Sequence, residues 1–521
     1  MKIVLLTFLS MMMSVLQAQE KIVYQTPPHE IMELVDIERA PSVVLDSKKE
    51  QMLFLHRPTF MSLNELNQPE MRLGGLRINP ETNISSTLTY YQDIRYQKVM
   101  EQEVKPIAGL PEHPRIAYIS FSPDETKIAF THTAPTGVEL WMADLEKLTA
   151  VKLTDAVLNA NAGMPYTWFP NSRSLLVRML PENRKELVNN KMTLPVGPVV
   201  STSDGGISQN RTYQDLLKNP LDEANFETLM TSELYKVETD GTKTGWKEAG
   251  MYISEDFSPD GSFLLLTTLS HPFSYVVPYY SFPNETDLYT SDGRFLLNFN
   301  RRPLLDKLPV GFMATHEGKR SIHWRGDKPA TLAWVEALDK GDPEVKVPFR
   351  DALFELDAPF TDAPRALMQM RDRFADILWG NDQYAVVYDR WWNTRNSRIY
   401  LFDPSHPEKE PRIMDDRNYQ DVYSDPGIFQ TKKNALGSYT LKIDENTAYL
   451  FGDGYSAEGQ FPFVDALNLE TLGKKRIYQS TATDQLEDLV SFIDSKAGTL
   501  LTRIQSPTAY PNYYIRNIKK R

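Results

Sequence analysis

Cysteine is absent from the 521-residue chain. Its absence excludes disulfides, thiolate metal sites, a cysteine nucleophile and a lipidated N-terminal cysteine. An excess of basic residues is also lacking, since 57 Lys and Arg face 69 Asp and Glu, for a formal net charge of -12. Because phosphate backbones are bound chiefly by Lys and Arg, this balance argues against nucleic acid or an anionic membrane surface as a partner.

Long apolar runs are missing beyond the N-terminus. Lys2 is followed by the apolar residues 3–16, and Ala18 ends a plausible cleavage site. This pattern predicts a signal peptide over 1–18 and a secreted or periplasmic product without a membrane anchor. A retained anchor or a buried N-terminal strand is the weaker alternative, because the apolar run is short for a membrane span. We expect a lead-in segment over 19–44 and one large domain over 45–521.

Long segments of helical periodicity are scarce, and 35 Pro would interrupt them. What recurs is an aromatic or aliphatic residue, a turn-forming polar cluster and a β-rich run, most clearly in Phe-Ser-Pro-Asp at 121–124 and 257–260. Such a unit is typical of one blade of a β-propeller. The repeat predicts an all-β fold, a seven- or eight-bladed propeller of four-stranded antiparallel blades. Weaker copies begin at Leu45, Trp168, Trp324, Trp379, Ile443 and Ile493.

The spacing of these units exceeds a compact blade of about 40–50 residues, so inserted loops are expected. The longest insertion is predicted between Pro181 and Met230, with a short helix over 212–217. Trp141, Trp168, Trp324 and Trp379 are interpreted as packing residues between blades.

Tryptophans 391 and 392 are the exception among the aromatics, because they are adjacent. Neighbouring residues of a strand point to opposite faces, so at most one of Trp391 and Trp392 can face the core.

Recognisable catalytic motifs are lacking as well. The chain has no Gly-x-Ser-x-Gly elbow, and its nearest approach is Gly-Tyr-Ser-Ala-Glu-Gly at 454–459. It has no His-Glu-x-x-His, no phosphate-binding glycine loop and no EF-hand spacing. The sequence therefore predicts no catalytic residue, no metal site and no cofactor. A propeller glycosidase stays a remote alternative, since paired carboxylates such as Asp415-Asp416 are expected by chance in so acidic a chain.

Six segments, in order along the chain, resemble the N-terminal propeller of glutamyl endopeptidases, which belong to the prolyl oligopeptidase class of serine peptidases. The resemblance implies a propeller followed by a C-terminal α/β-hydrolase domain that supplies a Ser-Asp-His triad and cleaves after acidic residues. No position of this chain matches a catalytic residue, and the hydrolase domain is expected to be missing from it. The segments are Pro-Pro-His-Glu-Ile at 27–31, Leu-Asn-Gln-Pro-Glu-Met-Arg-Leu-Gly-Gly-Leu-Arg-Ile at 66–78, Arg-Thr-Tyr-Gln-Asp-Leu-Leu-Lys at 211–218, Ser-His-Pro-Phe-Ser-Tyr-Val-Val-Pro at 270–278, Arg-Ser-Ile-His-Trp-Arg-Gly-Asp-Lys-Pro-Ala-Thr-Leu at 320–332 and Asp-Val-Tyr-Ser-Asp-Pro-Gly at 421–427.

The resemblance implies a non-catalytic, substrate-gating role, with peptide substrates and the hydrolase domain as partners. Arginine suits an acidic side chain, because its planar fork holds a carboxylate at two points. Each candidate arginine could equally be solvated or brace a blade. The competing interpretation is a stand-alone propeller that binds a peptide or glycan, with Trp391 and Trp392 as stacking residues. The candidate substrate-binding arginines are Arg57, Arg72, Arg77, Arg320, Arg325 and Arg390.

Overall fold

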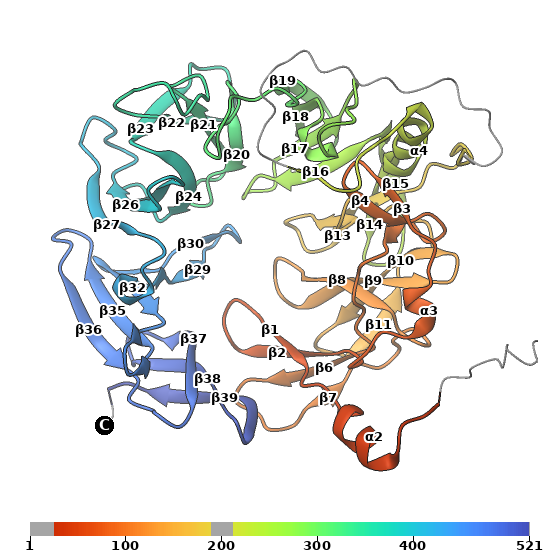
Figure 1. Ribbon diagram of the computed structural model, residues 1–521, viewed down its shortest axis with the longest axis horizontal. Helices are drawn as coiled ribbons and strands as arrows, with labels where there is room; N and C mark the ends of the chain where they lie inside the picture. The colour runs from red at the N-terminus through yellow and green to blue at the C-terminus, as the bar shows by residue number, and fades with distance from the viewer. Residues whose placement is uncertain (1–24, 189–211, 520–521) are drawn as a thin grey trace, which may run out of the picture. The chain divides into compact units, whose positions relative to one another are not determined.

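The computed structural model describes residues 25–188 and 212–519, which are almost entirely β-structure (Figure 1). The chain divides into two compact units. The described part of the smaller unit, residues 25–39 and 58–61, contains helix α2 (His29–Val35), and there the Thr59 hydroxyl donates to the Ile37 carbonyl at 2.6 Å. The predicted signal peptide lies outside the described residues. Within 25–188 and 212–519, no helix is both long and apolar enough to cross a membrane.

The larger unit, residues 40–57 and 62–519, is a series of antiparallel sheets whose strands pair in chain order. This is the arrangement of a β-propeller, as the repeat predicted; the number of blades stays a prediction. The strands are: sheet 1, β1 (Ser42–Leu45), β2 (Gln51–His56), β6 (Asp93–Lys98) and β7 (Lys105–Pro106); sheet 2, β8 (Ile116–Phe121), β9 (Lys127–Ala134), β10 (Gly137–Asp144) and β11 (Thr149–Lys152); sheet 3, β12 (Tyr166–Trp168), β13 (Ser174–Met179), β14 (Ser232–Glu238) and β15 (Lys243–Gly250); sheet 4, β16 (Tyr252–Phe257), β17 (Phe263–Leu269), β18 (Asn284–Thr290) and β19 (Phe295–Arg302); sheet 5, β20 (Arg320–Trp324), β21 (Thr331–Ala337), β22 (Asp351–Asp357) and β23 (Arg365–Met370); sheet 6, β24 (Arg373–Trp379), β25 (Ala385–Trp391), β26 (Asn396–Phe402) and β27 (Arg412–Asn418); sheet 7, β28 (Ile428–Phe429) with β31 (Ile443–Asp444), β32 (Thr447–Gly452), β35 (Phe463–Asn468) and β36 (Lys474–Gln479); and sheet 8, β37 (Leu486–Asp494), β38 (Thr499–Ser506) and β39 (Ala509–Asn517).

Shorter elements are inserted between these strands. The ranges of these elements are β3 (Met71–Leu73), β4 (Leu76–Asn79) and β5 (Ile84–Ser85) in one small sheet, the hairpins β29 (Thr431–Lys433) with β30 (Tyr439–Leu441) and β33 (Tyr455–Ser456) with β34 (Gly459–Gln460), helices α3 (Leu63–Leu66) and α4 (Pro220–Met230), and the 3-10 turns η1 (Tyr279–Ser281) and η2 (Val422–Ser424).

The repeated Ser-Pro-Asp clusters form the turns between first and second strands. The Ser258 hydroxyl donates to the Asp260 carboxylate at 2.6 Å, and the same carboxylate accepts the backbone N–H of Ser262 at 3.0 Å. Ser122 and Asp124 repeat the first contact at 2.6 Å. A short side chain that hydrogen-bonds its own backbone replaces the bonds that the turn cannot make, which explains why the same residues recur there.

Sheet 7 departs from the repeat. Its first strand is interrupted: β28 and β31 pair with successive parts of β32, on the side of β32 away from β35. Hairpin β29–β30 occupies the interruption. The predicted start at Ile443 therefore marks the second half of a split strand.

The long insertion is present between β13 and β14, but its predicted helix is wrong. Residues 212–217 contain no helix, and Asp215 has a φ of 57°. Helix α4 begins later, because the Asn219 side chain accepts the N–H groups of Leu221 and Asp222 and Pro220 stands in the first turn. The Asn-Pro pair was the better helix-start signal.

Each sheet packs on the next through one apolar cluster. Sheets 1 and 2 share Leu53 and Ile116, and sheets 7 and 8 share Val464 and Phe492. The other clusters join the intervening sheets in chain order. In the described residues, no cluster of this kind joins sheet 8 to sheet 1. Trp168, Trp324 and Trp379 are buried in these clusters, whereas Trp141, on a third strand, is half-buried beside one.

The connections fall on two edges of the sheets. We call turn edge the side where first strands join second strands and third join fourth, and insertion edge the side where second strands join third and each sheet joins the next. Turn-edge connections are short, such as 258–262, whereas insertion-edge connections include 57–92 and 180–231. Four of the six resembling segments lie in insertion-edge connections; segment 320–332 runs from β20 through a turn-edge connection into β21, and segment 27–31 belongs to the smaller unit.

Candidate functional site

Three of the segments that carry the family resemblance meet on the insertion edge. Leu73 of β3, Leu217 and Phe273 are buried in one apolar cluster, together with Phe226 of helix α4. These residues come from three separate connections, and the cluster lies apart from those between the sheets. The connections therefore form a structured layer over this edge.

Backbone contacts hold this layer in a defined position. The Gly75 N–H donates to the Asp215 carbonyl at 2.8 Å, and the Tyr279 N–H donates to the Gly74 carbonyl at 2.8 Å. Gly75 has a φ of 87°, and a Cβ atom there would lie 2.7 Å from the Pro278 Cβ. A side chain at Gly75 would be strained and would clash, so this position needs glycine.

Two candidate arginines belong to the same layer. Arg72 and Arg77 face each other across hairpin β3–β4, and the Asp215 carboxylate lies 2.7 Å from Arg77 Nε and 3.7 Å from Arg72. Arg72 also pairs with Glu70 at 2.6 Å. The hydrogen bond to Asp215 raises the pKa of Arg77. Both arginines are thus partly neutralised by acids of their own chain.

Arg320, mostly buried, and Arg325, fully buried, each pair with acids of sheet 5. Arg325, 1% exposed, holds Asp327 with two nitrogens and Glu355 with a third at 2.5 Å, and its guanidinium lies 4.1 Å from the Trp379 ring centre. Arg320 pairs with the buried Asp351. The structure places both where they brace sheet 5, and in their present pairing neither offers a free fork to a ligand.

Arg57 and Arg390 have no carboxylate partner in the described residues. Arg57 is half-buried in the connection that follows β2. Arg390 is exposed near the insertion-edge end of β25, 5.7 Å from the ring centre of Tyr419. The six candidates therefore do not form one arginine cluster.

Aromatic side chains are exposed close to Arg390. Trp391 is half-buried against the Arg350 guanidinium, 4.0 Å from its ring centre, whereas Trp392 is 42% exposed. Trp392 lies between the Arg395 guanidinium at 3.8 Å and the ring of Phe312 at 5.3 Å. Neither tryptophan belongs to an apolar cluster of the core, in agreement with the expectation that at most one could face it, and Trp392 supplies an open aromatic surface.

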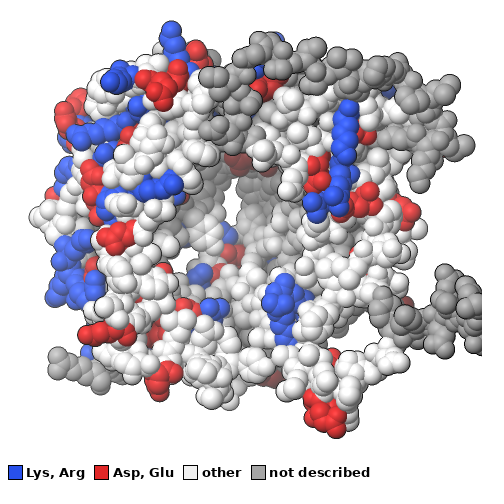
Figure 2. Space-filling view, viewed as in Figure 1, with Lys and Arg blue, Asp and Glu red and all other residues white. Residues whose placement is uncertain are grey.

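The two edges differ in how many exposed apolar side chains they carry. On the insertion edge they stand in most of the connections and in η1 and η2, whereas the turn-edge connections of the described chain have Met100 and Val104. Exposed charges of both signs are interspersed over the view of Figure 2 and form no patch of one sign. The insertion edge therefore has the composition of a protein-docking surface. Its largest exposed apolar side chains include Leu66, Val276, Tyr280, Phe312, Trp392 and Tyr423.

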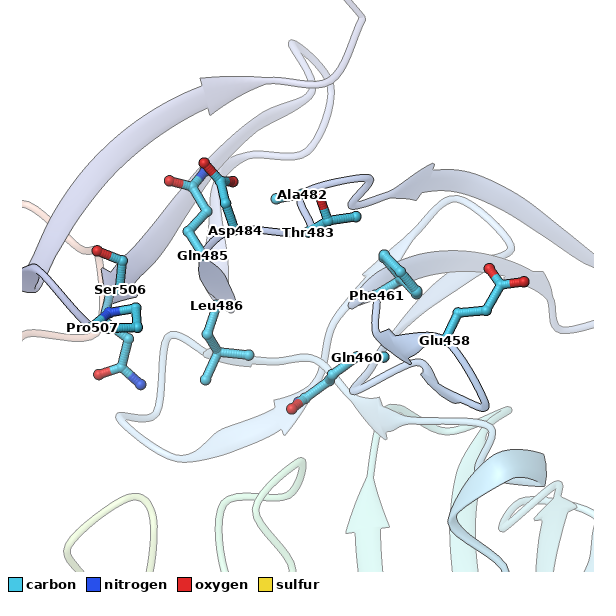
Figure 3. A pocket seen from close by; sticks show the side chains of 12 residues that line it. Glu458, Gln460, Phe461, Ala482, Thr483, Asp484, Gln485, Leu486, Ser506 and Pro507 are labelled. Carbon is cyan, nitrogen blue, oxygen red and sulfur yellow. The ribbon is translucent and has the colours of Figure 1, made fainter.

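A cavity of about 560 Å³ opens on the same edge between sheets 7 and 8 (Figure 3). It is lined by residues of hairpin β33–β34, among them Glu458, and by Asp484, Gln485 and Ser506. Its charged lining residues are acidic, so it has no complement for an acidic peptide side chain. The near-miss elbow at 454–459 forms this hairpin and not a strand-to-helix turn.

The first strands of sheets 4 and 6 carry two acids, Asp256 and Asp376, that form no ion pair with Lys or Arg in the described chain. Water reaches both side chains, but the protein atoms around Asp256 raise its pKa to about 6. Residues 25–188 and 212–519 contain no group of three or more His, Cys, Asp or Glu suited to a metal ion.

Sequence comparison finds curated relatives. A probable chloroplastic glutamyl endopeptidase of rice (Oryza sativa subsp. japonica) is 34% identical over 94% of this chain and 55% of its own length. Its counterpart in Arabidopsis thaliana is 33% identical over 92% and 52%. The chain thus spans about half the length of the curated relatives it matches. No family model matches it.

Among solved structures, one from a study of two prolyl endopeptidases aligns with 93% of this chain and 57% of its own, at 12% identity and a TM-score of 0.42. The sheets described above and the curated relatives together define this chain as a β-propeller related to peptidases.

Proposed function

We propose that this chain is the substrate-gating, non-catalytic propeller of a secreted serine peptidase that cleaves after acidic residues. The observation that carries the proposal is the 34% identity, over 94% of the chain, to about half of a probable glutamyl endopeptidase. The partner would be an α/β-hydrolase domain, and the substrates would be peptides. Secretion rests on the N-terminal sequence 1–18.

The insertion edge is the face we propose for the hydrolase domain. Three of its connections are packed into a fixed layer by Phe226 and its neighbours, and its connections expose aromatic side chains. A docking surface needs both properties, because a rigid surface loses little conformational entropy on binding and buried aromatics supply most of the affinity.

Selection of acidic peptides would depend on Arg390 more than on the buried arginines. Arg320 and Arg325 already hold acids of their own sheet, and freeing Arg325 would leave the Asp327 side chain, 4% exposed, without its ion pair. Arg390 is exposed beside Trp391 and needs no such rearrangement. Arg57 is the second candidate on the same grounds.

A chimaera tests the proposal. In it, this chain replaces the matching segment of the rice relative, and the purified protein is assayed with a quenched Glu-containing peptide and with a folded protein that displays the same sequence. We expect cleavage of the peptide alone. Equal cleavage of both substrates would contradict gating, and loss of both activities in a folded chimaera would contradict the assignment of this chain as the peptidase's propeller.

The same chimaera tests the arginine. Arg390→Gln is expected to raise KM for Glu-containing peptides by about tenfold, since a charged hydrogen bond contributes roughly 1.5–3 kcal/mol. Arg173→Gln, at an exposed turn-edge arginine, is the matched control. An unchanged KM in Arg390→Gln would remove Arg390 from the substrate site.

A stand-alone binding module is the second candidate function, favoured by the open aromatic pair of Phe312 and Trp392. In that case the purified chain would bind peptides or glycans without a hydrolase domain, and Trp392→Ala would abolish binding. Tryptophan fluorescence titration with a peptide and a glycan panel distinguishes this function from gating.

A further inference from the structure

Hairpin β29–β30 is an insertion in the innermost strand of sheet 7. Its two ends continue into β28 and β31, which together take the first-strand position beside β32. In a propeller the first strands surround the central channel. The hairpin therefore starts at the wall of the channel, and Figure 1 shows it directed towards the middle of the larger unit.

The hairpin reaches sheets that lie far from its own in the series. The Lys433 ammonium contacts the Pro123 carbonyl at 2.7 Å and the Glu125 carboxylate at 3.1 Å, both in the first turn of sheet 2. Glu125 in turn accepts the Ser47 hydroxyl of sheet 1 at 2.8 Å. Through the Glu125 side chain, the hairpin of sheet 7 is thus linked to both sheet 2 and sheet 1.

The same hairpin also contacts sheets 5 and 6. Asn434 donates its side-chain amide to the Gly326 carbonyl of sheet 5 at 2.7 Å, and Leu441 lies against Gly380 of sheet 6. Sheets 3 and 4 separate sheet 2 from sheet 5 in the series. A single hairpin can touch both only by crossing the space between them at the turn edge.

These contacts matter because the two ends of the series are not otherwise sealed in the described structure. Sheets 1 and 8 share no strand pairing and no apolar cluster of the kind that joins the other neighbours. At the turn edge, Lys48 and Glu125 line a cavity of about 800 Å³ together with Ile493 of sheet 8.

We infer that hairpin β29–β30 is a clasp that closes the propeller across its centre, in place of a strand shared between its first and last sheets. Lys433 attaches the clasp to sheet 2, and this ion pair with Glu125 is mostly buried, with side chains 18% and 8% exposed. Releasing the clasp lets the seam between sheets 1 and 8 open. This inference is independent of the proposed peptidase function.

Hydrogen–deuterium exchange of the purified chain tests the clasp. Lys433→Met should raise the exchange rates of the β1 and β37 amides by about tenfold, because it removes hydrogen bonds to a charged group. Lys432→Met, at an exposed position of the same strand, is the control and should leave the rates unchanged. Unchanged seam exchange in folded Lys433→Met, or an equal rise in the control, would overturn the inference.

A cross-link supplies the converse test in a chain without cysteine. A Cβ at Gly326 would lie 3.3 Å from the Ser438 Cβ, close to the usual disulfide separation of about 3.5–4.5 Å. Oxidised Gly326→Cys/Ser438→Cys fixes the hairpin to sheet 5, so it should slow seam exchange relative to its reduced form when Lys433 is present, but not in the Lys433→Met background, where the attachment to sheets 1 and 2 is lost. If Lys433→Met does not fold, Glu125→Gln replaces it. Seam exchange equal to wild type in Glu125→Gln, or a disulfide that slows seam exchange equally with and without Lys433, would refute the clasp.

Discussion

The turn edge and the insertion edge of this propeller are built from the same strands but differ in what they require of the sequence. Turn-edge connections repeatedly use an Asp or Asn side chain that accepts backbone N–H groups, as at Asp260 and Asn171, and two of them share the serine–aspartate turn. Insertion-edge connections share no motif, differ in length and expose aromatic side chains such as Trp392. The turn edge therefore stabilises the fold, and the insertion edge can vary in sequence and take part in recognition.

The largest expected effect on this comparison is a loss of folding stability caused by a substitution inside the insertion-edge layer. Phe226→Ala removes a ring that is 0% exposed and contacts the rings of Phe273 and Phe282. We expect the free energy of unfolding to fall by about 3–5 kcal/mol, measured by urea denaturation. Phe312→Ala, on the same edge but 47% exposed, should cost less than about 0.5 kcal/mol. Equal losses would show that the layer is not a core of its own.

A second effect concerns the exposed aromatics. If the insertion edge is a docking surface, the isolated chain should self-associate there, and Trp392→Ser should raise the dissociation constant about tenfold or more, as loss of an aromatic anchor does. Sedimentation equilibrium measures this constant. Met100→Ser, at a turn-edge side chain that is 80% exposed, is the matched control. An equal change in the control would erase the difference between the edges.

A smaller effect is expected at the turn edge. Burial alone would raise the pKa of Asp260, but the hydrogen bonds from Ser258 and Ser262 outweigh it, so the pKa lies below its ordinary 3.8. The carboxylate therefore contributes stability above pH 3.8 that is lost as pH falls through the lowered pKa. Asp260→Ala should cost about 1 kcal/mol at pH 7 and less at pH 2.5. A loss that does not shrink on acidification would mean that the ionised carboxylate is not what stabilises the turn.

The smallest expected effect is a gain in folding stability instead of a loss. Burial raises the pKa of Asp256 to about 6, so the stability associated with its neutral form is present below the ordinary pKa of 3.8 and is lost as pH rises through 6. Asp256→Asn should match wild type near pH 3.5 and be more stable at pH 8. Because water reaches the side chain, the gain should be only about 0.5 kcal/mol. Thermal melts across this pH range would reveal it, and a less stable variant at pH 8 would contradict it.

The sequence predicted the fold well, because the signals were local. A serine two residues before its aspartate forms the same turn wherever it occurs, so Ser122–Asp124 and Ser258–Asp260 could be read without knowing the rest of the molecule. The helix predicted over 212–217 is wrong for a local reason too, since Asn219 and Pro220 start the helix further along the chain.

The candidate site was predicted less well, because its determinants are pairings between distant residues. Nothing near Arg77 in the sequence shows that Asp215 neutralises it, and nothing near Lys433 points to Glu125. The sequence could not predict the open aromatic surface either, since Phe312 and Trp392 come from different connections. Four of the six segments of family resemblance lie in insertion-edge connections, whereas segment 320–332 contains a turn-edge connection. Which arginine reads a substrate stays a prediction.

The order of the sheets has a consequence for how the protein is made. Each cluster joins a sheet only to the one before it in the chain, so every sheet can pack as soon as the ribosome has released it. The Lys433–Glu125 contact is different, because it joins residues 308 positions apart. Until sheet 7 has emerged, the growing chain is a widening arc with a free end, and the clasp is the first contact that turns this arc into a ring.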